Sequence, residues 1–225
     1  MKLLFTSLAY LASAFGQQAG YPFQNPNLPV EQRIDNLLSL MTVEEKINCL
    51  GTRTGVPRLG VPNIGSSEGI HGLVQRGGRG PAITTTQFPQ PPGLGATWDP
   101  DLVRQAAGVE GFEARFVTQT ARYNRQVLQL WGPQSDLARD PRWGRSEEVY
   151  GEDPFLNGTL AAAFVKGLQG DDPKYWQAAA LLKHFLANSN EDHRNVSCPI
   201  STSACSGNTT PSHSEWRLSK AARRL

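Results

Sequence analysis

The sequence predicts an α/β fold in which parallel strands alternate with helices. Short apolar runs of strand length alternate with longer segments, two of which open with an aspartate–proline pair, and polar clusters follow the apolar runs. In folds of this class, ligands bind at the carboxyl ends of the strands. We therefore expect a site built from the loops that follow successive strands.

Four segments carry helix signals. Apolar spacing indicates the first, and Thr42 with Glu45 forms a capping box for the second. Asp99 and Asp153 each precede a proline, which is an N-cap followed by a residue suited to the first helical position. We expect helices over residues 31–40, 43–50, 100–116 and from 154 to about 167 or 170.

Three apolar runs are candidate strands: residues 61–65, 127–131 and 178–182. The segments between these elements are rich in Gly and Pro, which indicates loops. We expect an extended arm over residues 22–29, a loop over 66–72, a long surface loop over 77–92 and irregular chain over 133–150.

Charge and composition describe an ordinary globular chain. Its 225 residues are 39% hydrophobic, and the formal net charge is +2. Four of the basic residues and one acidic residue lie from Thr202 onward, so the remainder carries 18 basic against 19 acidic residues. Nothing in this balance indicates a nucleic acid partner or a membrane surface.

The first residues indicate secretion. Lys2 is followed by an apolar stretch from Leu3 to Leu11 and by small residues, which predicts a signal peptide over residues 1–16. No later stretch has the length of a membrane span. Sequons at Asn157 and Asn195 fit an extracellular route and are candidate glycosylation sites.

Polar side chains gather after the predicted strands. Glu68 lies in a glycine-rich segment, Arg139 to Arg145 spells RDPRWGR, and residues 183–194 contain KH and NEDHR. Taken singly, the first is also compatible with a solvated turn and the second with a structural ion-pair network. Lys183 is less easily explained without a partner, because it leaves a buried strand. Lys183 and His184 can both face a ligand only if the backbone is irregular there.

Several kinds of site do not fit these residues. The histidines and acids have no zinc-ligand spacing, the glycine-rich stretches lack a phosphate-loop Lys-Ser/Thr, and no G-x-S-x-G elbow is present. We expect no metal and no cofactor. Guanidinium, ammonium, imidazole and carboxylate groups suit a ligand covered in hydroxyls, and Trp131 or Trp143 could offer an apolar face to a sugar ring.

Five ordered motifs then point to one family. They are GVPRLGVPNIGSSEGIHG at 55–72, FPQPPGLGATWDPDLV at 88–103, RDPRWGRSEEVYGEDP at 139–154, KGLQGD at 166–171 and KHFLANSNEDHR at 183–194. Together they resemble glycoside hydrolase family 3, the β-glucosidases and β-xylosidases. The resemblance implies a (β/α)8 barrel of the TIM type, and the retaining, exo-acting hydrolysis of terminal β-linked glucose or xylose from oligosaccharides and glycosides.

The resemblance also implies residue roles. Glu68 would bind hydroxyls of the sugar being cleaved, and Arg145, Lys183, His184 and Arg194 would be neighbouring donors. Many β-glucosidases of the family have Asp where Glu68 stands, so the longer side chain favours a pentose. The family's nucleophile is an aspartate well downstream of the Lys-His pair, and its acid/base comes from a second domain, so we assign no catalytic residue here.

The tail of the sequence departs from the family. When codons are chosen for Thr202 to Trp216 and read one frame over, they spell DERLFREYYSVPFRM, a family-like string. We therefore expect a partial family 3 barrel domain over residues 17–197 and an out-of-frame tail over 198–225. A barrel typically needs about 250 residues, so we expect an incomplete, inactive barrel. The alternative to a truncated glycosidase is a non-catalytic sugar-binding or non-functional remnant.

Overall fold

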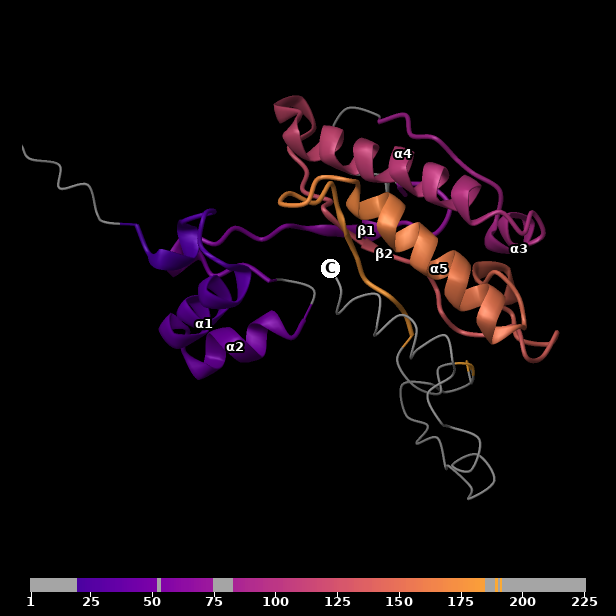
Figure 1. The fold of residues 1–225 in the computed structure, drawn as a ribbon, viewed down its shortest axis with the longest axis horizontal. Coiled ribbons are helices and arrows are strands. Elements are labelled where there is room, and N and C mark those ends of the chain that lie inside the picture. Colours follow the sequence, from indigo (N-terminus) through magenta and orange to yellow (C-terminus); the bar gives the residue numbers. More distant parts are fainter. Residues whose placement is uncertain (1–19, 52–53, 75–82, 185–188, 190, 192–225) are drawn as a thin grey trace, which may run out of the picture. The chain divides into compact units, whose positions relative to one another are not determined.

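The computed structural model describes residues 20–51, 54–74, 83–184, 189 and 191. These fall into two compact units that divide after Gly51. The predicted signal peptide, Arg194, Asn195 and the tail from residue 198 lie outside the described residues. Figure 1 shows the helices and the small sheet of the second unit.

The first unit contains two helices, α1 (Val30–Leu40) and α2 (Val43–Cys49). The predicted capping box is confirmed: Thr42 Oγ1 accepts from the Glu45 amide, and the Glu45 carboxylate accepts from the Thr42 amide. The prediction of an extended arm over residues 22–29 was wrong. This segment contains a 3-10 turn, η1 (Pro22–Gln24), because Phe23 is buried and its backbone bonds to Asn36 and Arg33 of α1.

The second unit is organised on a parallel three-stranded sheet in the order β1-β2-β3. Its strands are β1 (Ser66–Glu68), β2 (Gln129–Trp131) and β3 (Ala179–Ala180). Ser66 pairs with Gln129, and Gln129 pairs with Ala179. The parallel pairing confirms the predicted class, and β2 and β3 lie within the expected ranges.

The first strand was predicted too early. Residues 61–65 hold an isolated bridge between Val61 and Val56 around the turn η2 (Pro57–Leu59), and β1 begins only at Ser66. The carbonyl oxygens of Ile64 and Gly65 already accept from the amides of Leu128 and Gln129, just ahead of β1. At Gly65 φ is 64°, and a Cβ there would lie 1.9 Å from the carbonyl oxygen of Gln126, so this close approach requires glycine. The segment expected to be a loop therefore supplies the strand.

Two long helices cover the sheet: α4 (Pro100–Gln119) and α5 (Pro154–Gln169). Asp99 caps the first through the amides of Asp101 and Leu102, and Asp153 caps the second through the amide of Leu156. They pack side by side (Figure 1), and a Cβ at Gly167 would lie 2.1 Å from the carbonyl oxygen of Arg104. A small residue at this position thus allows the close contact. The core between helices and sheet includes Val103, Ala107, Leu130, Leu160, Phe164 and Leu168.

Short helical pieces complete this unit. The sequence missed α3 (Pro91–Gly95), whose proline-rich start had indicated a loop. The turn η3 (Ala121–Tyr123) follows α4. The segment expected to be irregular, 133–150, contains one turn, η4 (Ser146–Glu148), next to the polar cluster described below.

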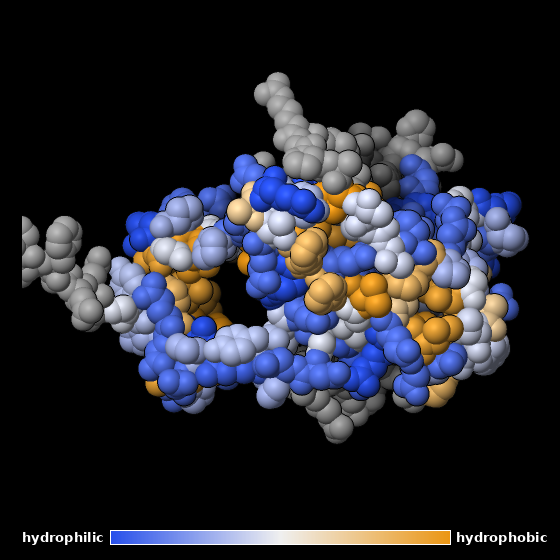
Figure 2. Space-filling model, turned by 90° about the horizontal axis from the view of Figure 1, so that it is seen from above, coloured by the Kyte–Doolittle hydropathy of each residue, from blue (hydrophilic) through white to orange (hydrophobic). Residues whose placement is uncertain are grey.

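Part of the surface remains apolar. Figure 2 shows hydrophobic patches among hydrophilic surface, and on α4 the exposed apolar side chains are those of Leu102, Val109, Phe112 and Phe116. These residues lie opposite the buried face of α4. Within the described residues, no helix combines the length and apolar character needed to cross a membrane.

Candidate functional site

Glu68 and Lys183 meet at the carboxyl ends of β1 and β3. Glu68 is the last residue of β1, and Lys183 lies three residues beyond β3, where it forms a bridge with Gln134. Lys183 Nζ donates to Glu68 Oε2 at 3.0 Å. The side chains are 13% and 24% exposed, so water screens this ion pair only in part. Lys183, which the sequence predicted to need a partner, is thus paired with Glu68.

A second carboxylate, Glu148, continues the cluster. The guanidinium of Arg145 donates to both Glu148 oxygens at 2.7 Å, a bidentate pair, and Lys183 Nζ lies 3.7 Å from Glu148 Oε2. Burial would raise the pKa of Glu148, but the hydrogen bonds and charge of Arg145, with the charges of Lys183 and His184, hold it below its ordinary value. Glu148 is therefore a carboxylate at neutral pH.

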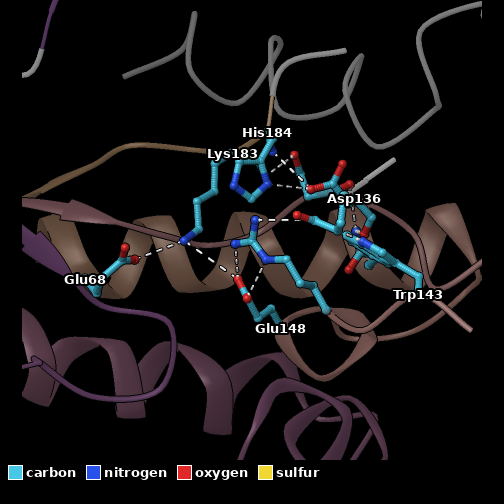
Figure 3. Close-up of polar contacts among 10 residues, drawn as sticks. Glu68, Asp136, Trp143, Glu148, Lys183 and His184 are labelled. Atoms are coloured by element: carbon cyan, nitrogen blue, oxygen red, sulfur yellow. Dashed lines mark hydrogen bonds and ion pairs between the residues drawn. The ribbon is translucent and has the colours of Figure 1, made fainter. Parts of the chain in front are cut away.

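His184 belongs to the same cluster through Asp136. Both the backbone amide of His184, at 3.1 Å, and its ring atom Nδ1, at 3.0 Å, contact Asp136 Oδ2. The Lys183–His184 peptide bond is cis. Figure 3 shows both side chains turned toward the labelled group of Glu68, Asp136 and Glu148, so the backbone is irregular at the position where two consecutive side chains face one site.

Trp143 and Glu191 close one side of the cluster. The indole Nε1 of Trp143 donates to Glu191 Oε1 at 3.4 Å, and Arg145 Nη1 lies 3.8 Å from the same oxygen. Trp143 is buried, whereas Trp131 at the end of β2 is half-buried. The ring of Trp143 thus supports Arg145 through Glu191.

The structure brings four of the five predicted binding residues together: Glu68, Arg145, Lys183 and His184. The fifth, Arg194, lies outside the described residues. Sequence reasoning missed Asp136 and Glu148. The spacing of Glu148 three residues after Arg145 was a usable signal for an ion pair, whereas nothing in the sequence around Asp136 distinguished it from other loop carboxylates.

The rest of the RDPRWGR motif divides between site and surface. Asp140 and Arg142 form an exposed ion pair at 2.5 Å, with the Arg142 side chain 89% exposed. The interpretation of the motif as an ion-pair network thus suits Asp140 and Arg142, whereas Arg145 belongs to the cluster. Within the part of the chain that the structure describes, no group of three or more His, Cys, Asp or Glu residues is arranged to hold a metal ion.

The structure buries Asn157, which the sequence offered as a glycosylation site. Its side chain is fully buried in α5, and its amide nitrogen donates to the carbonyl oxygens of Ser135 and Asp136, while its oxygen accepts from the Tyr150 amide. A glycan attaches to that nitrogen and requires solvent around it. In this fold the asparagine ties the loop after β2 to the helix, which speaks against a glycan at this position.

The cluster alternates acceptors and donors along one line: Glu68, Lys183, Glu148 and Arg145. Each member is oriented by its neighbour, so the groups are held in place before a ligand arrives. Such an array can bind several hydroxyl groups of one small polar molecule.

Comparison with known proteins identifies the family. The family model described as the glycosyl hydrolase family 3 N terminal domain matches residues 30–203. The chain belongs to glycosyl hydrolase family 3. A xylan 1,4-β-xylosidase of Xylanibacter ruminicola is 34% identical over 205 residues, covering 84% of this chain and 22% of the relative.

Solved structures agree with this family 3 assignment. A family 3 exo-β-xylosidase in complex with a xylobiose aziridine probe matches with a TM-score of 0.56 and 29% identity, over 73% of this chain and 22% of that one. β-Glucosidase 3B from Thermotoga neapolitana, in complex with α-D-glucose, gives a TM-score of 0.56 and 30% identity, over 70% and 23% of the two chains. The chain thus spans about a fifth of the length of these relatives. Its fold is α/β, an incomplete part of the barrel domain.

Proposed function

We propose that the cluster around Lys183 binds the terminal, non-reducing sugar of a β-linked xyloside or glucoside, as part of an exo-acting β-glycosidase. The single observation that carries the proposal is the array in which Glu68, Lys183, Glu148 and Arg145 contact one another at the carboxyl ends of parallel strands. Binding sites in barrel enzymes lie at this end of the strands. Membership of family 3 supports the same assignment.

The chemistry of the cluster suits vicinal hydroxyls. A sugar hydroxyl both donates and accepts a hydrogen bond. The carboxylates of Glu68 and Glu148 accept only, whereas Lys183 and Arg145 donate only. Two neighbouring hydroxyls that contact one carboxylate and one cation can therefore both donate and accept hydrogen bonds without any movement of the protein.

Xylose is the better candidate for the bound sugar. Glu68 is one methylene longer than aspartate, so its carboxylate reaches further into the site and leaves less room for the exocyclic CH2OH that glucose has and xylose lacks. The similarity to a xylan 1,4-β-xylosidase and to an exo-β-xylosidase supports this preference.

These residues account for binding, not for bond cleavage. Retaining hydrolysis needs two carboxyl groups about 5–5.5 Å apart, one to attack the anomeric carbon and one to protonate the leaving oxygen. Glu68 and Glu148 are already paired with cations, which suits them to accept hydrogen bonds from a ligand. We assign the nucleophile and the acid/base to no residue of the cluster.

Turnover assays on the full chain test the proposal. Aryl β-xylosides and aryl β-glucosides are offered to the unmodified chain, to Glu68→Ala and to Glu68→Asp, with binding of methyl β-xyloside and methyl β-glucoside measured in parallel. We expect the two glycosides to bind, Glu68→Ala to abolish binding and Glu68→Asp to shift the preference toward glucose. Turnover that disappears in Glu68→Ala would show that the chain holds a complete catalyst. Binding that persists in Glu68→Ala would refute the site.

A further inference from the structure

One oxygen of Asp136 contacts two nitrogens of His184. Oδ2 accepts from the backbone amide at 3.1 Å and lies 3.0 Å from ring Nδ1. The Asp136 side chain is 13% exposed and that of His184 is 23% exposed. The contact spans 48 residues of sequence, from the loop after β2 to the segment after β3. Asp136 therefore fixes both the backbone and the ring of the same residue.

This contact determines where the ring proton is held. An ionised carboxylate has no hydrogen to donate, so Nδ1 must carry the proton for the 3.0 Å contact to be a hydrogen bond. In a neutral imidazole the other nitrogen then has a lone pair and no hydrogen. Nε2 is accordingly the ring nitrogen that can accept a hydrogen bond.

We infer that Asp136 is a positioning residue that holds His184 in the Nδ1–H tautomer, so that Nε2 accepts a hydrogen bond from a hydroxyl of the bound sugar. The inference rests on the proposed sugar-binding function. Asp136 itself need not touch the sugar. Its role resembles that of carboxylates that orient a histidine ring in other sites, where the second partner selects the tautomer.

The tautomer complements the neighbouring lysine. Lys183 can only donate, and its Nζ is held by Glu68 and Glu148. A neutral His184 that accepts at Nε2 supplies the opposite function one residue further along the chain. Of two adjacent sugar hydroxyls, one then accepts a hydrogen bond from Lys183 Nζ and the other donates a hydrogen bond to His184 Nε2.

Nitrogen NMR tests the inference without any sugar. The chain has four histidines, so 15N-histidine labelling gives few ring signals, and His184→Gln identifies those of His184. At alkaline pH, where imidazole is neutral, we expect the proton of His184 on Nδ1 and none on Nε2. In Asp136→Ala we expect the proton to move to Nε2 in at least part of the population. The matched control is Asp172→Ala, which removes an exposed carboxylate that accepts from the amides of Lys174 and Tyr175.

A proton on Nε2 in the unmodified chain overturns the inference, and this spectrum decides the matter even if Asp136→Ala fails to fold. An unchanged tautomer in a folded Asp136→Ala overturns it equally. With methyl β-xyloside added, we expect the Nε2 signal to shift and Asp136→Ala to weaken binding about tenfold, the value of one hydrogen bond. Sugar binding without a shift of Nε2 refutes the acceptor role. The Nδ1–H tautomer with no sugar binding refutes the proposed function and leaves the action of Asp136 on His184 in place.

Discussion

Replacing Lys183 by methionine removes a cation from between two carboxylates. Lys183 Nζ lies 3.0 Å from Glu68 and 3.7 Å from Glu148. Methionine keeps the length and the apolar stem of the side chain, so the change is chiefly one of charge. Without the ammonium, two partly buried carboxylates remain near one another with less compensation.

The magnitude follows from these distances. Each contact corresponds to about 5 kcal/mol of Coulomb energy at an effective dielectric constant near 20, but the cost of desolvating the lysine offsets much of it. Removing one partner of a fully buried pair costs about 3–5 kcal/mol. Because Glu68 and Glu148 are 24% and 22% exposed, water screens part of the loss, and we expect Lys183→Met to lower the free energy of unfolding by about 2–4 kcal/mol at pH 7.

Urea unfolding of the full chain at pH 7 measures this change. The control is Lys174→Met, an exposed lysine whose removal should change stability by no more than about 0.5 kcal/mol. Equal effects of Lys183→Met and Lys174→Met would refute the account of the cluster.

Three further predictions follow from burial and pairing. Burial raises the pKa of Glu110 to about 8, so this carboxyl keeps its proton in the folded chain, whereas it ionises near pH 4.5 in the unfolded chain. As the pH rises from 5 to 7, the free energy of unfolding of the unmodified chain should therefore fall by about 3 kcal/mol relative to that of Glu110→Gln, measured by urea unfolding. Asn157→Ala should cost about 2–4 kcal/mol in the same assay, because one buried and two partly buried backbone groups lose their partner. Mass spectrometry of material from a eukaryotic host should find no glycan on Asn157. The lowered pKa of Glu148 stabilises the fold above about pH 4.5, and this stability is lost as the pH falls through the pKa that Glu148 has in the folded chain. Arg145→Lys lacks the bidentate fork, so its acid unfolding, followed by circular dichroism, should occur at a higher pH. The Glu110 prediction is refuted if the stability of the unmodified chain does not change with pH relative to Glu110→Gln. Unchanged stability of Asn157→Ala contradicts the second prediction, and an unchanged acid-unfolding pH in Arg145→Lys contradicts the third.

Local signals in the sequence were sufficient for the helices. Asp99 and Asp153 each precede a proline, and both cap a helix, because a cap acts within one turn of chain. The bounds of β1 depend on its pairing with β2, a contact between segments about 60 residues apart in the sequence. Alternation of apolar residues carries no information about such contacts.

The site was foreseen in part for the same reason. Glu68, Arg145, Lys183 and His184 stand in motifs that follow strands, so their convergence follows from parallel pairing. Asp136 was missed because its role depends on the return of the chain 48 residues later, which brings the His184 amide and ring to one carboxylate oxygen. Asn157 shows the converse, since a sequon says nothing about whether its asparagine is buried.

Direct titration of the full chain with methyl β-xyloside tests the central claim, that the Lys183 cluster binds a terminal sugar. Calorimetry on the unmodified chain, Glu68→Ala and Asp172→Ala compares a loss within the cluster with the loss of a remote, exposed carboxylate. We expect saturable binding that is abolished by Glu68→Ala and unchanged by Asp172→Ala. Equal binding by all three chains, or no binding by a folded unmodified chain, would contradict it.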